Sequence, residues 1–218
     1  MAAGRGIRMR PLTDKIPKAM AQVSGKTLIS RGIRKIKNKI DNIHITVGYK
    51  ASLLASHVIE NDVSSVFNTE GKGNAWWIYN TIIKNLNEPI FVLTCDNVFE
   101  IDFDKYFQDY KKLQSPACMI IPTQYSKEFE GDSIYFDKYR KINNISRNNA
   151  SDFICSGIQI LNPKIINNIT LKCENFSEVW NQLIVKDQVY CSNLILENWY
   201  AVDNLIQLIN LNNKEESI

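Results

Sequence analysis

The sequence predicts an α/β fold, with a doubly wound, mixed and mainly parallel sheet flanked by helices. In the first half, β-branched runs alternate with segments of helical periodicity, which is typical of β-α-β units. Residues 89–95 read PIFVLTC, a nearly continuous apolar run expected in a strand buried on both faces. The chain has 218 residues, 44% of them hydrophobic and 22% charged, which is ordinary for one substantial globular domain.

The elements of the first half follow from this alternation. Isoleucines recur at helical spacing between residues 29 and 40, which predicts an amphipathic helix over roughly 26–40. The β-branched run after it predicts a strand over 43–47 that ends at Gly48. Beyond it we expect a helix over 51–60, a strand over 63–67, a glycine turn at 71–73 and a helix over 74–86.

The second half is predicted to hold more strands than helices. We expect strands at 117–122, 133–137 and 153–161, helices near 163–169, 175–186 and 203–211, a polar loop at 143–152 and a frayed tail from 214. No composition shift marks a linker, so we expect one domain over 1–218. Its halves would cover about 1–115 and about 116–211, with a tail at 212–218.

Bulk properties narrow the function classes. A net charge of +3 is too small to indicate nucleic acid as a partner. No apolar run reaches the length of a membrane span, and no signal peptide is visible. The five cysteines are scattered without a C-x-x-C pair, which favours free thiols in a reducing cytoplasm. The oligomeric state stays open, a homo-oligomer included.

Residues 2–18, AAGRGIRMRPLTDKIPK, are the most informative segment. Gly4 and Gly6 permit the turns and close approach that anion-binding loops need. Two prolines keep the segment from continuing as a helix. Cationic side chains supply charge-assisted donors beside the backbone: Arg5, Arg8, Arg10, Lys15 and Lys18. A solvated basic segment is the alternative, but the combination of features favours a phosphate-binding loop.

This segment resembles the signature of the sugar-1-phosphate nucleotidyltransferases, L-A-A-G-x-G-T-R-L-x-P-L-T-x-x-x-P-K. The matching residues are Ala2, Ala3, Gly4, Gly6, Arg8, Pro11, Leu12, Thr13, Pro17 and Lys18, while Ile7 and Met9 depart from it. The family's loop follows a buried first strand, whereas this sequence begins inside the motif. We therefore expect either a start further upstream or a truncated relative.

The resemblance implies a Rossmann-like fold with a nucleotide-binding half and a small acceptor-binding lobe. It implies that Ala2, Ala3, Gly4, Arg5 and Gly6 contact the nucleotide. It also assigns catalytic roles, in which Arg8 stabilises the pyrophosphate and Lys18 contacts the α-phosphate and the incoming phosphate.

Two aspartates are candidate Mg²⁺ ligands. Asp96 follows the apolar run, at the strand edge where ligands of open α/β sheets bind. The resemblance implies that Asp96 is a metal-binding catalytic residue. Asp203, in WYAVD, resembles the family's second metal-binding aspartate, although the spacing differs by two residues. Mg²⁺ prefers oxygen ligands, so both fit chemically, while a helix cap is the alternative for each.

Other segments resemble the family less closely. Gly73 and Asn74 lie between a predicted strand and helix, where the family reads the nucleotide base. Gly157 and Arg147 fall where the family binds the acceptor. The aromatic residues of the 74–86 helix (Trp76, Trp77 and Tyr79) fit core packing better than ligand stacking.

The function implied is transfer of a nucleotidyl group from a nucleoside triphosphate to a sugar 1-phosphate, giving a nucleotide-sugar and pyrophosphate. A phosphate monoester is mostly dianionic near neutral pH, so this nucleophile needs no general base. A phosphocholine-type cytidylyltransferase shares the opening loop and is one alternative, which an aromatic pocket would favour. A non-catalytic nucleotide or sugar-phosphate binding protein is another.

Overall fold

The computed structural model describes residues 1–147 and 151–216. The chain forms two compact units. The first unit comprises Met1–Lys72, Thr94–Val98 and Tyr200–Ile218, and the second comprises Gly73–Leu93 and Phe99–Trp199. Each unit is therefore assembled from segments far apart in the sequence.

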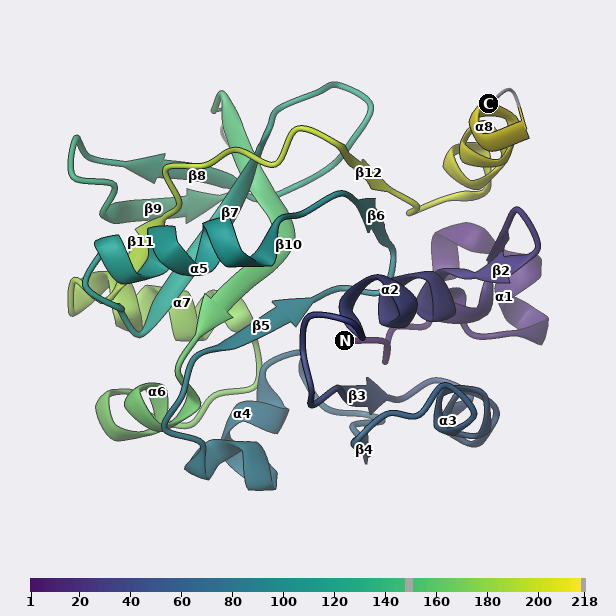
Figure 1. Cartoon of the computed structure of the whole chain (residues 1–218), viewed down its shortest axis with the longest axis horizontal. Coiled ribbons are helices and arrows are strands. Elements are labelled where there is room, and N and C mark those ends of the chain that lie inside the picture. Colours follow the sequence, from purple (N-terminus) through teal and green to yellow (C-terminus); the bar gives the residue numbers. More distant parts are fainter. Residues whose placement is uncertain (148–150, 217–218) are drawn as a thin grey trace. The chain divides into compact units, whose positions relative to one another are not determined.

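A parallel strand pair forms the centre of the first unit. β3 (His44–Val47) pairs with β4 (Ser65–Asn68), and α3 (Ala51–Ile59) connects them (Figure 1). α2 (Leu28–Ile36) buries Ile29 and Ile33 against Ile45 and Val58. The isoleucine spacing thus predicted the buried face of α2, although the helix is shorter than expected. The Thr27 side chain caps it by accepting a hydrogen bond from Ser30 N.

The other elements of the first unit come from both ends of the chain. Short turns of helix follow the N-terminus: η1 (Ile7–Met9), α1 (Leu12–Lys15) and η2 (Lys18–Met20). The hairpin β1 (Gln22–Val23) and β2 (Lys26–Thr27) leads into α2. The C-terminal helix α8 (Leu205–Glu216) buries Leu208 and Leu211 with Met9 and Val23, so both ends of the chain share one apolar cluster.

A six-stranded sheet forms the centre of the second unit, in the order β11-β7-β10-β8-β9 with β5 also on β10. Its strands are β5 (Ile90–Leu93), β7 (Cys118–Gln124), β8 (Ser133–Phe136), β9 (Ile142–Ser146), β10 (Phe153–Leu161) and β11 (Val189–Cys191). β11 is parallel to β7, whereas β10 is antiparallel to β5, β7 and β8. The predicted α/β class with a mixed sheet flanked by helices is confirmed, but the pairs in this sheet are mainly antiparallel rather than mainly parallel. In β5 only Val92 is buried, so that strand is less enclosed than its apolar run suggests.

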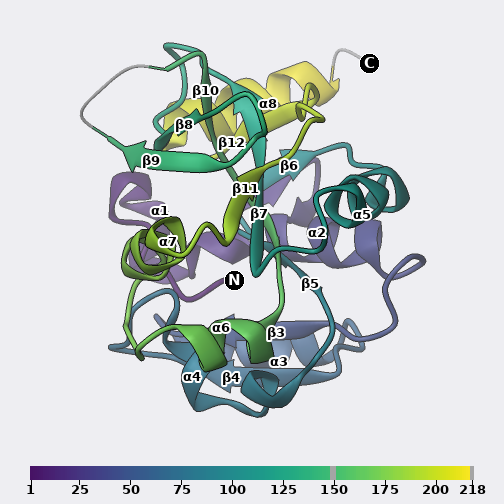
Figure 2. The ribbon, with the colours of Figure 1, turned by 90° about the vertical axis from the view of Figure 1, so that its left-hand side faces the viewer.

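The helices of the second unit are seen beside the sheet in Figures 1 and 2. They are α4 (Trp76–Asn80), the 3-10 helix η3 (Ile82–Asn85), α5 (Phe103–Lys112), α6 (Pro163–Ile169) and α7 (Phe176–Val185). The helix predicted over 74–86 is interrupted at Thr81, whose backbone is extended and whose hydroxyl accepts from Ile83 N. Asp102 caps α5.

Several elements differ from the sequence prediction; the hairpin β1–β2 and strand β11, for instance, were not predicted. Residues 143–146 belong to strand β9 rather than to a polar loop, because pairing with β8 satisfies their backbone groups. The remainder of the predicted loop includes residues 148–150, outside the described residues. α8 extends to Glu216, beyond the predicted helix end at 211 and through most of the predicted tail. The short strands β6 (Asn97–Phe99) and β12 (Trp199–Ala201), which pair with each other, were not predicted.

All five cysteines are free, as predicted, and Cys118 and Cys191 are buried. Within residues 1–147 and 151–216, the structure contains no helix long and apolar enough to cross a membrane. The single-domain organisation over 1–218 and its two halves stay predictions.

Candidate functional site

The start of the basic loop is anchored by backbone hydrogen bonds. Ala2 N donates to Thr46 O at 3.0 Å, and Tyr49 N donates to Ala3 O at 3.1 Å. On the other side, Cys95 N donates to Met1 O at 3.0 Å. Residues 1–3 therefore lie between the end of β3 and the segment that carries Asp96. Gly4, Arg5 and Gly6, which are predicted to contact the nucleotide, follow directly after these hydrogen-bonded residues.

Gly6 cannot be replaced by a larger residue without displacing Lys18. Its φ of 62° is left-handed, and a Cβ there would lie 2.7 Å from Cβ of Lys18. The Thr13 hydroxyl donates to Gly6 O at 2.8 Å and closes the loop on itself. The glycine thus allows the loop to pack closely on the Lys18 side chain. Glycine is needed here for lack of space as well as for its backbone conformation.

Two residues after β3 support the loop and were not predicted as site residues. A Cβ on Gly48 would lie 2.7 Å from Ala3 O, so only glycine fits beside the loop. The Tyr49 hydroxyl donates to Thr13 O at 3.0 Å, and the Arg5 guanidinium lies 5.2 Å from the centre of the Tyr49 ring. The Gly-Tyr pair directly after a predicted strand was the available signal.

Lys18 joins the two predicted aspartates. Its Nζ lies 2.7 Å from Asp96 Oδ2 and 2.8 Å from Asp203 Oδ1. Arg8 approaches the same Asp203 oxygen at 3.2 Å. The Lys18 side chain is 11% exposed, whereas that of Arg8 is 53% exposed. The structure therefore brings together Arg8, Lys18, Asp96 and Asp203, from three distant parts of the sequence.

Apolar packing accounts for this convergence. Ala19 and Cys95, the neighbours of Lys18 and Asp96, pack in the cluster around β3. Val202, the neighbour of Asp203, is buried with Met9 and Leu28. In addition, Val202 N donates to Asp96 O at 2.9 Å. Each charged side chain thus projects from a backbone segment that its apolar neighbours hold in place.

The charges in this group stabilise one another. Burial favours the neutral forms of Lys18 and Asp96, but their mutual attraction and hydrogen bonds outweigh it. The pKa of Lys18 is consequently raised above 10.5, and the pKa of Asp96 is lowered below 3.8. Next to them, burial raises the pKa of the Cys95 thiol to about 12. Lys18 and Asp96 are therefore an ion pair at neutral pH.

Asp203 does not cap helix α8. Asn204 does so, because its Oδ1 accepts from Gln207 N at 2.9 Å. The Gln207 side chain in turn accepts from Asp203 N at 2.7 Å. With the cap supplied by its neighbour, the Asp203 carboxylate is directed to Lys18 and Arg8.

In the second unit, Gly73 and Asn74 are bound to the segment before α7. Gly73 N donates to Glu174 Oε2 at 2.9 Å, and Asn74 Oδ1 accepts from Phe176 N at 2.8 Å. A Cβ on Gly73 would overlap with Glu174 O. The glycine is thus required by close backbone contact, and the two groups expected to contact the nucleotide already have partners in the protein.

The predicted acceptor-binding residues lie on the sheet of the second unit. Gly157 has a φ of 79° at the register shift between Cys155 and Ile158 in β10, where a glycine is favoured. Arg147 Nε donates to Asp132 Oδ1 at 2.7 Å, with its side chain 80% exposed. The structure does not bring Arg147 and Gly157 into contact by any described hydrogen bond.

Two of the three aromatic residues of α4 pack in the core, as predicted, whereas Trp76 is only partly buried. Trp77 is 6% exposed and lies edge-on to Phe176, and Tyr79 is 1% exposed. The Tyr79 hydroxyl is hydrogen bonded to Thr170 Oγ1 at 2.9 Å. These two rings are therefore buried against other side chains and do not form an aromatic pocket for a quaternary amine.

A divalent cation could be held by the two aspartates that meet at Lys18. No group of three or more His, Cys, Asp or Glu side chains suited to a metal occurs among the described residues. Two carboxylates from separate segments, 26% and 18% exposed, are the donors that remain. Mg²⁺ commonly takes one or two carboxylates and completes its shell with water and substrate phosphates, so this donor set fits Mg²⁺.

The sequence has relatives among known proteins. The sequence model of the nucleotidyl transferase family matches residues 1–217. The bifunctional protein GlmU of Methanococcus aeolicus is 30% identical over 111 residues, which cover 50% of this chain and 26% of GlmU. The mannose-1-phosphate guanyltransferase of Saccharomyces cerevisiae is 26% identical over 210 residues, which cover 89% of this chain and 58% of the yeast protein. The chain thus spans about a quarter of GlmU and somewhat over half of the yeast protein.

The fold has close counterparts among solved structures. The crystal structure of HddC from Yersinia pseudotuberculosis superposes with a TM-score of 0.79 and covers 98% of this chain and 96% of HddC, at 20% identity. At that identity the likeness concerns the fold. The family match covers all the residues that form the group around Lys18. The chain belongs to the nucleotidyl transferase family.

Proposed function

We propose that the protein transfers a nucleotidyl group from a nucleoside triphosphate to a sugar 1-phosphate, releasing pyrophosphate. The observation that carries the proposal is the group of Lys18, Asp96 and Asp203 next to the glycine-rich loop. It combines a buried cation, two carboxylates and a loop with exposed arginines. Binding and neutralising a polyphosphate requires this combination.

The loop residues would bind the triphosphate. Gly4 and Gly6 leave the backbone accessible to phosphate oxygens, while the support from Thr13 and Tyr49 keeps the loop in one conformation. Arg5 and Arg8 are exposed and can turn toward phosphate. Arg8 would neutralise the leaving pyrophosphate, and Lys18 would contact the α-phosphate and the incoming phosphate.

Asp96 and Asp203 would hold Mg²⁺. When bound, the ion would neutralise charge on the triphosphate oxygens. Because Lys18 is paired with both carboxylates, a bound cation would compete with it for the same oxygens. Lys18 would then be free to contact the substrate phosphates.

The reaction balances without a protein base. A phosphate oxygen of the sugar 1-phosphate attacks the α-phosphorus, the bond from that phosphorus to the β-phosphate bridging oxygen breaks, and pyrophosphate leaves with the electron pair. The attacking phosphate is already mostly dianionic at neutral pH. The protein would therefore contribute positioning and charge neutralisation.

The names of relatives favour a sugar phosphate as the acceptor. The yeast relative is a mannose-1-phosphate guanyltransferase, and a relative in Haloferax volcanii is a UTP–glucose-1-phosphate uridylyltransferase. Phosphocholine is less favoured because Trp77 and Tyr79 are packed in the core. Gly73 and Asn74 would contact the base, and Arg147 and Gly157 the acceptor. A cytoplasmic location stays a prediction from the free cysteines.

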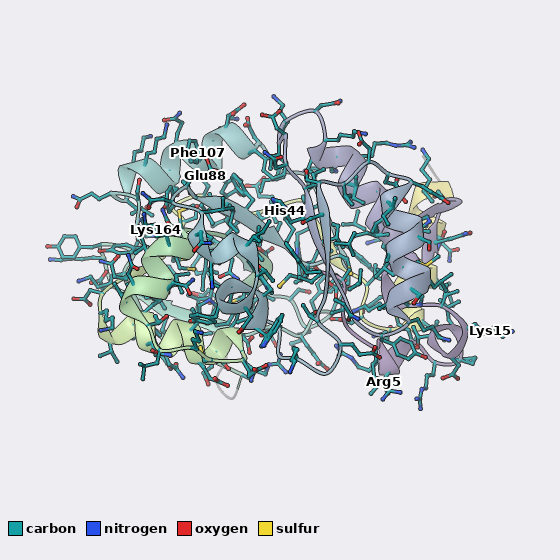
Figure 3. All side chains as sticks on the ribbon, turned by 90° about the horizontal axis from the view of Figure 1, so that it is seen from below. Arg5, Lys15, His44, Glu88, Phe107 and Lys164 are labelled. Atoms are coloured by element: carbon teal, nitrogen blue, oxygen red, sulfur yellow. The ribbon has the colours of Figure 1, made fainter. Side chains whose placement is uncertain are left out.

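A substrate panel with pyrophosphate detection tests the proposal. The full chain would be incubated with Mg²⁺, each nucleoside triphosphate and either a sugar 1-phosphate or phosphocholine. We expect pyrophosphate release that requires one sugar 1-phosphate, and its loss in Lys18→Gln. Lys15→Gln is the matched control, since Lys15 is an exposed lysine of the same loop (Figure 3). Triphosphate binding without pyrophosphate release from any pair would instead support a binding protein.

A further inference from the structure

The second unit contains a polar cavity formed by residues outside the proposed transfer site. Its volume is about 420 Å³, within the range of small-molecule sites. The lining residues are Tyr79, Lys84, Asn85, Lys164, Asn167, Asn168 and Lys172. They come from α4, η3, α6 and the residues after α6, and Lys164 is labelled in Figure 3.

The lining of the cavity contains three lysines and no carboxylate. No Asp or Glu lines it, and residues 73–87 and 153–173, which supply the lining, contain none. In the described part of the chain, Lys84, Lys164 and Lys172 have no ion-pair partner. Three lysines around one cavity favour an anion, and phosphate is the anion that lysine commonly binds.

The walls are held by internal hydrogen bonds. Lys164 N donates to Leu86 O at 3.0 Å, which joins the start of α6 to the end of η3. Thr170 Oγ1 donates to Ile166 O at 2.7 Å, so the Tyr79 hydroxyl must donate to Thr170 Oγ1. The Tyr79 hydroxyl and the start of α6 are therefore held in place, and the three lysines line the same cavity.

Asn167 offers a ligand a hydrogen-bond acceptor, whereas the lysines offer donors. Its Nδ2 donates to Ile78 O at 3.0 Å and to Pro163 O at 2.8 Å, which uses both amide hydrogens. What Asn167 can offer a ligand is its carbonyl oxygen, which accepts a hydrogen bond. A bare phosphate dianion has no hydrogen to donate, whereas a hydroxyl group has one. The lining thus suits a molecule that carries both phosphate and hydroxyl groups.

We propose that this cavity binds a phosphate ester of a polyol, namely a sugar phosphate or a nucleotide. The ammonium groups of Lys84, Lys164 and Lys172 bind the phosphate, and Asn167 Oδ1 accepts from a hydroxyl of the sugar or ribose. The lining contains none of the residues proposed for nucleotidyl transfer. The proposal therefore does not depend on the transferase activity and can be tested in a variant without it.

Lysine footprinting of the full chain provides the test. Acetylation of Lys84, Lys164 and Lys172 would be measured by mass spectrometry with and without each probe, in the Lys18→Gln background. The probes are glucose 1-phosphate against inorganic phosphate, and UTP against pyrophosphate. We expect at least about twofold slower acetylation of these lysines with one organic probe, beyond the effect of its inorganic counterpart. Equal protection by the inorganic anions, or none at all, would overturn the proposal.

A triple variant with a matched control makes the test independent of footprinting. In K84Q/K164Q/K172Q, affinity for the protecting probe should fall about tenfold or more by calorimetry. The control K112Q/K127Q/K186Q removes the same charge from exposed lysines of the same unit and should bind as before. Equal losses in the two variants would show a general charge effect and reject the cavity. Asn167→Asp should weaken binding as well, because it adds a negative charge to the cavity.

Discussion

Gly6 and Lys18 are packed so closely that a Cβ on Gly6 would lie 2.7 Å from Cβ of Lys18. The glycine of the loop and the lysine that binds both aspartates are thus one packing unit. A side chain at residue 6 would therefore displace Lys18, whose ammonium group contacts Asp96 and Asp203.

Gly6→Ala should reduce stability and activity together. The left-handed backbone costs about 1–2 kcal/mol for a residue with a Cβ, and the contact with Lys18 adds to that. Chemical unfolding and pyrophosphate release would be measured. Gly4→Ala is the control for stability, because a Cβ there meets no atom within 4 Å. If Gly6→Ala and Gly4→Ala unfold at the same denaturant concentration, the packing argument is wrong.

Lys18→Ala should destabilise the protein as well as abolish turnover. Removal of the ammonium leaves Asp96 without its lysine counter-ion and Asp203 with only the more exposed Arg8, at a cost of about 2–4 kcal/mol. Adding Asp96→Asn to this variant should restore part of the stability without restoring activity. The double-mutant cycle measures the coupling between the two residues. A coupling energy near zero would contradict the ion pair.

The Lys18–Asp96 pair predicts a loss of stability in acid. The folded-state pKa of Asp96 lies below its ordinary value of 3.8, so the pair stabilises the protein above that pH. The contribution is lost as the pH falls through the lowered pKa. The pKa of Lys18 is raised above 10.5, so its contribution persists below that value and is lost at more alkaline pH.

Unfolding free energies of the wild type and Asp96→Asn should therefore differ most near neutral pH and converge below about pH 4. Glu60→Gln, an exposed change outside this group, should run parallel to the wild type at neutral pH. A difference between the wild type and Asp96→Asn that stays constant from neutral pH to about pH 3 would contradict the lowered pKa.

Tyr49→Phe tests whether the loop needs its support. The change removes the hydrogen bond to Thr13 O and should cost about 1 kcal/mol, while the ring under Arg5 remains. We expect a higher KM for the triphosphate with a smaller change in kcat, because a looser loop must be ordered on binding. Tyr139→Phe, at an exposed tyrosine, is the control. An unchanged KM in Tyr49→Phe would show that the loop holds its shape without this bond.

The site was predictable from the sequence where local motifs carry chemistry. The basic loop, through its resemblance to the family signature, and the aspartate after an apolar run made Lys18 and Asp96 candidates, since loop glycines, prolines and strand ends are local features. Asp203 was ambiguous because an aspartate before a helix is also a typical cap. The neighbouring Asn204 takes the cap in the structure. That outcome depends on side-chain geometry, which spacing does not determine.

The sequence by itself determined the α/β class, the positions of most helices and strands, and the residue types of the basic, glycine-containing loop. These follow from periodicity and from the limits that glycine and proline set on the backbone. Only the tertiary structure decided that Lys18 bridges Asp96 and Asp203. Packing of Val202 with Met9 and pairing of β6 with β12 bring these segments together. Such contacts depend on the complementary surfaces of distant segments, which no local pattern records.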